Sequence, residues 1–193
     1  NRLQVLGDYP LCHPALVNYL NSRAIDTSIA KKFCREVHYS VGERNYFAIG
    51  FRNDYGGWEL RSERFKGCST PKHITTIDNG SDKALAFEGF MDFLSFLTIK
   101  RNDSPTCNIA VLNSVANIQK AVPFLARHRS ICTLLDNDDA GRKALAEIER
   151  LCPQSKVIDQ SDFYRRHKDL NDYLRWKQPR KRVVVKQKRG FKM

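Results

Sequence analysis

The sequence has no long apolar run and no targeting segment. Its 193 residues contain no uninterrupted apolar stretch that approaches the roughly 18 residues a membrane-spanning helix needs. The first ten residues, NRLQVLGDYP, lack the charged-then-apolar arrangement of a secretory signal. We therefore expect a cytoplasmic protein with no membrane partner. Because the first residue is Asn1, we also expect that an upstream part of the chain is missing.

Paired cysteines are absent too. The six cysteines are scattered, with no CxxC pair and no histidine at zinc-ligand spacing after one. Buried reduced thiols are the usual state of such residues in an intracellular chain. We therefore expect no zinc in this chain.

Acidic residues are missing from the C-terminal segment. Residues 177–193 contain eight Lys or Arg and no acid, and so carry most of the formal net charge of +12. This composition suits a polyanionic partner, because each phosphate that a cation neutralises releases counterions. It is also typical of a flexible, solvated terminus. Both interpretations stay open.

Hydrophobic periodicity divides the rest of the chain into two units. Residues 1–80 contain two helical patterns and then short, aromatic and β-branched segments, with NDYGG as turn chemistry between two of them. After the turn-forming residues 78–82, apolar strands alternate with amphipathic helices, which predicts a parallel sheet covered on both faces. We therefore expect an α/β protein. It should have an α+β subdomain over residues 1–80, a Rossmann-like parallel-sheet domain over residues 81–176 and a basic tail over residues 177–193.

Carboxylates follow two of the predicted parallel strands. Glu88 closes the strand KALAFE, and Asp136 closes the strand SICTLLD, with Asp138 two residues further on. Because such strand ends meet at one edge of the sheet, we expect these side chains to converge. Three carboxylates this close need compensation, which a divalent cation with oxygen ligands supplies. The alternative is that Asp138 or Asp139 caps the next helix, although capping does not explain Asp136 or Glu88.

A further acidic group begins the last predicted helix. Asp169, Asn171 and Asp172 lie together in HKDLNDYLRWK. These residues either cap that helix or add carboxylates to the acidic edge.

Two of these motifs resemble a known family. AFEGFMDFLSFL (86–97) and LLDNDDAGRKAL (134–145) resemble the Toprim domain, the metal-binding α/β fold of DnaG-type primases, type IA and II topoisomerases, and OLD and RecR proteins. The primase branch is most similar, because TPKHIT (70–75) and KDLNDYL (168–174) also resemble primase motifs. The likeness covers about residues 10–175. It implies a primase catalytic core of a plasmid or mobilisable element.

The resemblance assigns roles to individual residues. It implies a site for Mg²⁺ or Mn²⁺ with the ligands Glu88, Asp136 and Asp138, a supporting Asp92, and a second acidic group formed by Asp169 and Asp172. It also implies that five basic side chains face phosphates of the template or the incoming nucleotide: Arg61, Arg64, Lys66, Lys72 and Arg142. The residues implied to be catalytic are Glu88, Asp136, Asp138 and Lys72. From the residues alone, the basic positions of the strands are equally consistent with an ordinary solvated strand face.

The activity implied by the resemblance is metal-dependent synthesis of short primers on single-stranded DNA. The expected partners are the template strand, nucleoside triphosphates, and a helicase or relaxase of the same element. Two alternatives stay open: a non-polymerising nucleic-acid-binding accessory protein, and a nuclease, because the same metal geometry serves hydrolysis. Full primases also carry an upstream zinc module that this chain cannot form. In addition, Asn137 and Asp139 depart from the small and basic residues of the primase motif.

Overall fold

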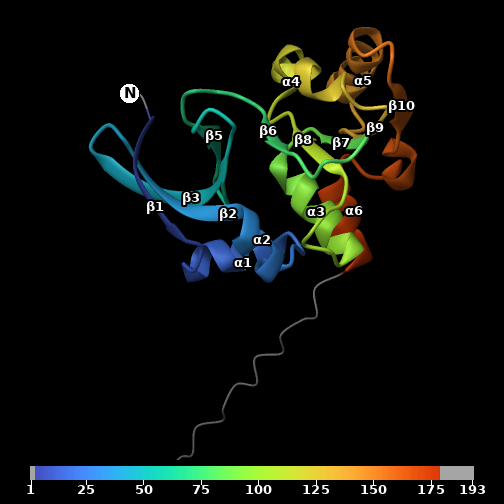
Figure 1. Ribbon diagram of the computed structural model, residues 1–193. Coiled ribbons are helices and arrows are strands. Elements are labelled where there is room, and N and C mark those ends of the chain that lie inside the picture. Colours follow the sequence, from blue (N-terminus) through green and yellow to red (C-terminus); the bar gives the residue numbers. More distant parts are fainter. Residues whose placement is uncertain (1–2, 179–193) are drawn as a thin grey trace, which may run out of the picture.

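Two five-stranded sheets organise the computed structural model, which describes residues 3–178 (Figure 1). The first sheet is an antiparallel meander with the order β1-β2-β3-β4-β5, and the second has the order β10-β9-β7-β8-β6. The predicted α/β class is confirmed. Within residues 3–178, every helix is too short or too polar to cross a membrane.

The first sheet and two helices form the N-terminal unit. Its elements are β1 (Leu3–Pro10), α1 (Pro14–Ser22), α2 (Thr27–Phe33), β2 (Cys34–Val41), β3 (Arg44–Arg52), β4 (Trp58–Ser62) and β5 (Phe65–Cys68). The sequence predicts both helices and the β3–β4 hairpin, but it does not predict β1. This strand pairs with β2 and has an irregular register between Val5 and Gly7. Gly7, Asp8 and Pro10 interrupt the strand pattern there, because they are poor strand formers.

The second sheet contains the predicted parallel strands. Its strands are β6 (Thr75–Ile77), β7 (Lys83–Phe87), β8 (Asn108–Val111), β9 (Ser130–Leu134) and β10 (Lys156–Asp159). β7 pairs in parallel with β8 and with β9, and β9 pairs in parallel with β10. β6 pairs antiparallel with β8. β6 precedes the turn at residues 78–82 and yet belongs to this sheet. A three-residue strand is too short to show a period in the sequence.

Helices cover both faces of the second sheet. They are α3 (Phe90–Lys100), α4 (Ile118–Leu125), α5 (Asp139–Leu151) and α6 (Leu170–Lys177), with the short 3₁₀ turns η1 (Val115–Asn117) and η2 (Ser161–Tyr164). α4 and α5 lie on one face, and α3 and α6 lie on the other (Figure 1). Alternate residues of β7 face the two layers, since Ala86 packs with the α4 and α5 core and Phe87 with the α3 and α6 core. The edge formed by the strand ends is therefore where a ligand can reach the sheet.

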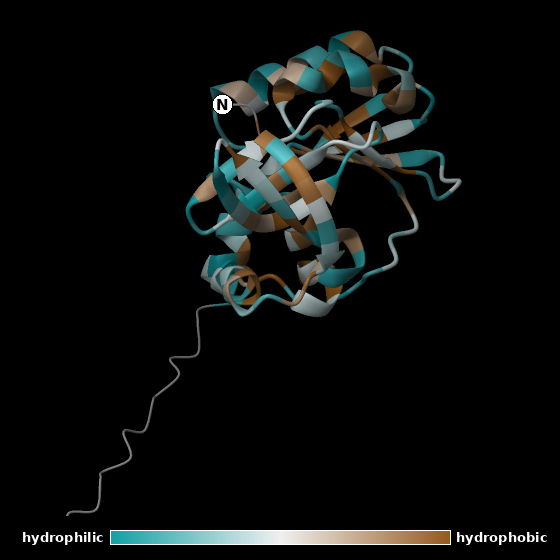
Figure 2. Ribbon diagram, turned by 90° about the vertical axis from the view of Figure 1, so that its left-hand side faces the viewer, coloured by the Kyte–Doolittle hydropathy of each residue, from teal (hydrophilic) through white to brown (hydrophobic). Residues whose placement is uncertain are grey.

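The two units share one hydrophobic core. Phe51 of β3 stacks on Phe90 of α3, with ring centroids 5.3 Å apart, and its centroid is 5.9 Å from that of Phe93. All three rings are buried. Hydrophobic and hydrophilic residues alternate along the strands and helices (Figure 2), as expected for elements with one buried face. The shared core therefore fixes the position of the first sheet relative to the strand ends of the second sheet.

Candidate metal centre

The ends of β7 and β9 bring two carboxylates to the same edge. These strands are parallel neighbours, with Phe87 opposite Leu134. Glu88 directly follows β7, and Asp136 is the second residue after β9. The backbone N–H of Asp136 donates to Oε2 of Glu88 at 3.4 Å. The two residues therefore meet as the spacing of the motifs predicts.

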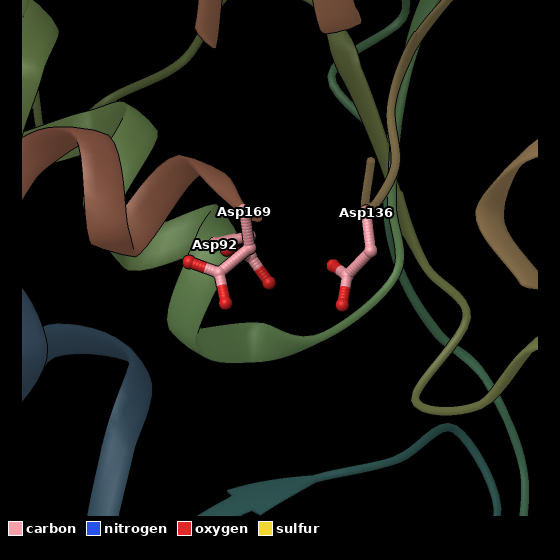
Figure 3. A group of neighbouring side chains, drawn as sticks. All are labelled: Asp92, Asp136 and Asp169. Atoms are coloured by element: carbon pink, nitrogen blue, oxygen red, sulfur yellow. The ribbon is translucent and has the colours of Figure 1, made fainter. Parts of the chain in front are cut away.

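Three aspartates form the closest acidic group among the described residues (Figure 3). One carboxylate oxygen each from Asp92, Asp136 and Asp169 lies within 4.8 Å of the others. Asp92 lies in the first turn of α3, and Asp169 is the N-cap of α6. Two helices on one face of the sheet and the loop after β9 thus direct their carboxylates to one point.

This proximity makes ionisation of the group costly. Burial raises the pKa of Asp136 to about 7, and the carboxylates of Glu88 and Asp169 add to the effect. Burial also raises the pKa of Asp92 well above its usual range, with Asp169 and Asp136 as further causes. The pKa of Glu88 is raised as well, mainly by burial. Carboxylate oxygens are the ligands that Mg²⁺ and Mn²⁺ prefer, and a divalent cation relieves this repulsion, so the donor set fits such an ion.

Lys168 lies beside the acidic group. It is not among the site residues that the sequence predicts. Its Nζ is 3.8 Å from Oδ2 of Asp136 and 3.7 Å from Oδ2 of Asp138. Asp136 is the main cause of the raised pKa of Lys168. The only signal in the sequence is its position directly before Asp169. This lysine supplies part of the positive charge that the site requires.

Asp138 caps α5 and lies at the rim of the acidic group. Its Oδ1 caps α5 by accepting hydrogen bonds from the backbone N–H groups of Ala140 and Gly141, each at 3.0 Å. Its pKa is lowered, chiefly by the bond from Gly141. Its Oδ2 faces Lys168, at the rim of the acidic group and outside the set of three. Asp139 instead forms an exposed ion pair with Arg142.

Asp172 lies on α6 but outside the acidic group of three. Its backbone N–H donates to Oδ1 of Asp169 at 2.7 Å, and its carboxylate is 3.4 Å from Nη1 of Arg175. Asp172 therefore helps to orient Asp169 through its backbone, and its side chain is engaged on the helix surface.

Asn137 joins the two loops that carry the site. Its side-chain amide donates to the backbone oxygens of Tyr164 at 3.2 Å and His167 at 3.0 Å. Its backbone N–H donates to the oxygen of Lys168 at 2.7 Å. The buried hydroxyl of Tyr164 donates to the oxygen of Leu135 at 2.7 Å. These bonds hold Asp136 and Asp169 at a fixed spacing, which gives a structural reason for an asparagine at this position of the motif.

A cleft of about 830 Å³ places basic residues opposite the acidic group. The second sheet and its helices line it with Glu88, Asp92, Asp136 and Asp169. The first sheet and the segment after it line it with Arg61, Arg64, Lys66 and Lys72, together with Glu59 and Glu63. The basic residues belong to β4, β5 and the segments around them. Arg142 is not among the lining residues. The structure thus brings four of the five predicted phosphate-binding residues together with four predicted metal-site residues.

The cleft also contains a carboxylate that the sequence did not suggest. Glu59 of β4 is 7% exposed, and burial raises its pKa to about 7 despite the nearby Arg61, Lys72 and Lys66. The pKa of Arg61 is lowered by burial, and its guanidinium lies 5.7 Å from the centroid of the Phe90 ring. Alternation along β4 directs Glu59 and Arg61 to the same side of the strand.

Comparison with known proteins identifies the fold. Residues 85–174 match the Toprim-like family, and residues 5–70 match a family described as a domain of unknown function, DUF8464. No curated protein gave a match. The primase fragment of the bacteriophage T7 primase-helicase protein superposes with a TM-score of 0.58 at 19% identity, covering 86% of this chain and 74% of that chain.

Two further solved structures have the same fold. A chain of the bacteriophage T7 lagging-strand DNA polymerase complex with the primase domains of two gp4 subunits, an RNA/DNA hybrid and dTTP gives a TM-score of 0.53 at 20% identity. The match covers 78% of this chain and 84% of that chain. The zinc-binding and RNA polymerase domains of the Aquifex aeolicus primase give a TM-score of 0.53 at 16% identity, covering 78% and 50%.

The fold and the acidic edge define a class, an α/β protein with a candidate hard-cation site at the carboxyl ends of parallel strands. Within that class, residues 85–174 match the Toprim-like family, and most of the chain has the fold of solved primase structures. The predicted resemblance to the Toprim domain and to the primase fold is confirmed, and the origin in a plasmid or mobilisable element stays a prediction.

Gly141 allows α5 to approach the loop that carries Asp136. A Cβ at Gly141 would lie 2.0 Å from the backbone oxygen of Asp136, whereas a Cβ at Gly89 would meet Oδ2 of Asp92 at 3.7 Å, an ordinary contact. We expect Gly141→Ala to destabilise the protein by about 1–3 kcal/mol through overpacking, although helix propensity alone favours alanine. Chemical denaturation measures the difference, with Gly89→Ala as the matched control. Equal stability of Gly141→Ala and wild type would contradict the contact.

The raised pKa of Asp136 predicts a stability that depends on pH and metal. Without metal, the folded state retains a proton on Asp136 up to a pKa of about 7, while the unfolded chain releases it near its ordinary value. Metal-free wild type should therefore lose stability as the pH rises between these two values. Asp136→Asn has no such ionisation, so at pH 8 it should be more stable than metal-free wild type by about 1–3 kcal/mol.

The measurement is thermal unfolding in EDTA and in Mn²⁺, at pH 5 and pH 8. The advantage of Asp136→Asn should shrink at pH 5, and Mn²⁺ should raise the melting temperature of wild type but not of the variant. Asp139→Asn is the matched control, because Asp139 lies in the same segment with an 87% exposed side chain. If Mn²⁺ stabilises Asp136→Asn as much as wild type, the metal centre is elsewhere.

Proposed function

We propose that this protein is a primase-type nucleotidyltransferase. It synthesises short primers on single-stranded DNA from nucleoside triphosphates, with Mg²⁺ or Mn²⁺. The observation that carries the proposal is one cleft with the three-aspartate group on one side and four cationic side chains on the other. The likeness of the fold to solved primases supports it.

The acidic side of the cleft suits the transfer of a nucleotidyl group. Asp92, Asp136 and Asp169 would hold the cation, with Glu88 beside Asp136. A divalent ion in such a site stabilises charge on the transferred phosphate and favours an ionised attacking hydroxyl. Asp138 contributes from the rim through Oδ2, because its Oδ1 is engaged as the cap of α5.

The basic side of the cleft suits a polyphosphate chain and a template strand. Arg61 is partly buried, and its guanidinium is fixed over Phe90, so it provides a positioned cation rather than a mobile one. Lys66 and Lys72 extend the positive lining from β5 and the segment after it. Such preorganised cations stabilise phosphate charge without reorganisation. We assign no direct contact to Arg142 or to the side chain of Asp172, since neither lines the cleft.

The test is primer synthesis by the full chain on single-stranded DNA. Labelled products of two or more nucleotides should form with nucleoside triphosphates and Mg²⁺ or Mn²⁺. Asp136→Ala should lower the rate by at least about 100-fold, because it removes a carboxylate from the centre of the charged site. Asp139→Ala should remain close to wild type, since Asp139 pairs with Arg142 on the surface.

Other outcomes separate the two alternative functions. Cleavage of plasmid DNA that needs metal and Asp136, without any primer, would indicate a nuclease, because similar metal sites serve hydrolysis. Binding of single strands that Asp136→Ala leaves unchanged, with neither cleavage nor synthesis, would indicate an accessory protein. Either result would overturn the proposed activity.

A further inference from the structure

A cluster of aromatic rings lies on the surface next to the metal centre. It comprises Phe163, His167, Tyr173 and Trp176, which we call the α6 aromatic surface. Ring centroids are 4.9 Å apart for Phe163 and Tyr173, 5.4 Å for His167 and Trp176, and 5.6 Å for His167 and Tyr173. The side chains of Phe163 and Trp176 are 54% and 66% exposed. His167 and Tyr173 are half-buried between them. Exposed rings that gather with others mark a binding surface more often than scattered single residues do.

The surface lies on the helix that begins at the metal centre. Asp169 is the N-cap of α6, and Tyr173 and Trp176 are three residues apart within the helix, which is the spacing of one helix face. The opposite stripe, with Leu170 and Leu174, is buried in the core. Seven residues of helix span about 10 Å. A strand that leaves the metal centre along α6 therefore meets these rings.

Basic residues outnumber acidic ones around the rings, which favours a polyanion. Residues 161–178 contain five Lys or Arg and three Asp, and Nζ of Lys177 lies 5.8 Å from the centroid of the Tyr173 ring. In sequence, residues 179–193 follow the end of α6 with seven Lys or Arg and no acid. Exposed aromatic rings interleaved with cations are the combination that binds single-stranded nucleic acid, because the rings stack on bases and the cations neutralise phosphates.

We propose that the α6 aromatic surface is a second contact site for single-stranded nucleic acid, with Trp176 as its main stacking residue. The site lies outside the residues that line the cleft. The proposal that single-stranded nucleic acid binds here rests on the proposed function. Stacking of bases on the rings requires neither the metal nor catalysis. Binding here extends the contact between the protein and the strand beyond the reacting nucleotides.

The two tryptophans of the chain allow a direct test. Trp58 is 6% exposed and Trp176 is 66% exposed, so quenching of tryptophan fluorescence by a ligand reports mainly on Trp176. The full chain is titrated with an oligothymidylate in EDTA, which keeps the metal centre out of the measurement. We expect saturable quenching that weakens with salt. Trp176→Ala should raise the Kd, measured with a labelled oligothymidylate, by about tenfold or more.

Matched variants distinguish stacking from a general effect on the fold. Trp176→Phe retains an aromatic face and should keep the Kd within about threefold of wild type. Tyr9→Ala removes an aromatic side chain that is 51% exposed on β1, distant from α6 in Figure 1, and should leave the Kd unchanged. A wild-type chain that makes no primers but still binds the oligonucleotide in a Trp176-dependent way would overturn the proposed function and leave this site standing.

Two results would overturn the site. One is an unchanged Kd and no quenching difference in Trp176→Ala. The other is a self-associating protein whose Trp176 fluorescence changes with protein concentration and not with oligonucleotide, and whose association is lost in Trp176→Ala. The second result would assign the surface to a contact between copies of this chain.

Discussion

The burial and mutual repulsion of carboxylates at the open edge of the second sheet are the constraint on which the site depends. Asp92, Asp136 and Asp169 are brought together by elements that pack for other reasons: α3 and α6 bury their apolar faces against the sheet, and β9 pairs with β7. The core therefore stabilises an arrangement that the carboxylates alone would oppose. Strongly perturbed acids in a cleft are typical of functional sites, because a bound cation or substrate offsets the repulsion.

The shared core has a second consequence, because it positions positive charge opposite this negative edge. Phe51 from the first sheet packs between aromatic residues of α3, and the guanidinium of Arg61 lies over Phe90 of the same helix. The helix that provides Asp92 thus also orients a cation of the facing wall. Because α3 supports both the acidic and the basic wall of the cleft, the distance between the two walls is fixed. A reaction at a phosphate requires such fixed positions.

The loops at the strand ends contain little regular structure, and specific contacts replace it. Asn137 bonds to the segment that carries Lys168 and Asp169, and Tyr164 bonds to Leu135 beside Asp136. The absence of a Cβ at Gly141 lets α5 begin against the same loop. Asp138 contributes both to the helix start and to the site, because its Oδ1 caps α5 and its Oδ2 faces Lys168. Residues that depart from a motif can therefore serve the geometry of the site rather than its chemistry.

The sequence by itself determined the α/β class, the parallel strands and the acidic strand ends, because these depend on local periodicity and on residue types close together in the chain. It predicted that Glu88 and Asp136 share an edge. It did not determine β1 or β6, whose sequences are irregular or too short, or that Asp92 and Asp169 form the group of three carboxylates with Asp136. Nor did it indicate a role for Lys168, Glu59 or the aromatic rings near Trp176. Their importance arises from neighbours distant in sequence, and only tertiary packing decides which side chains meet and which are desolvated.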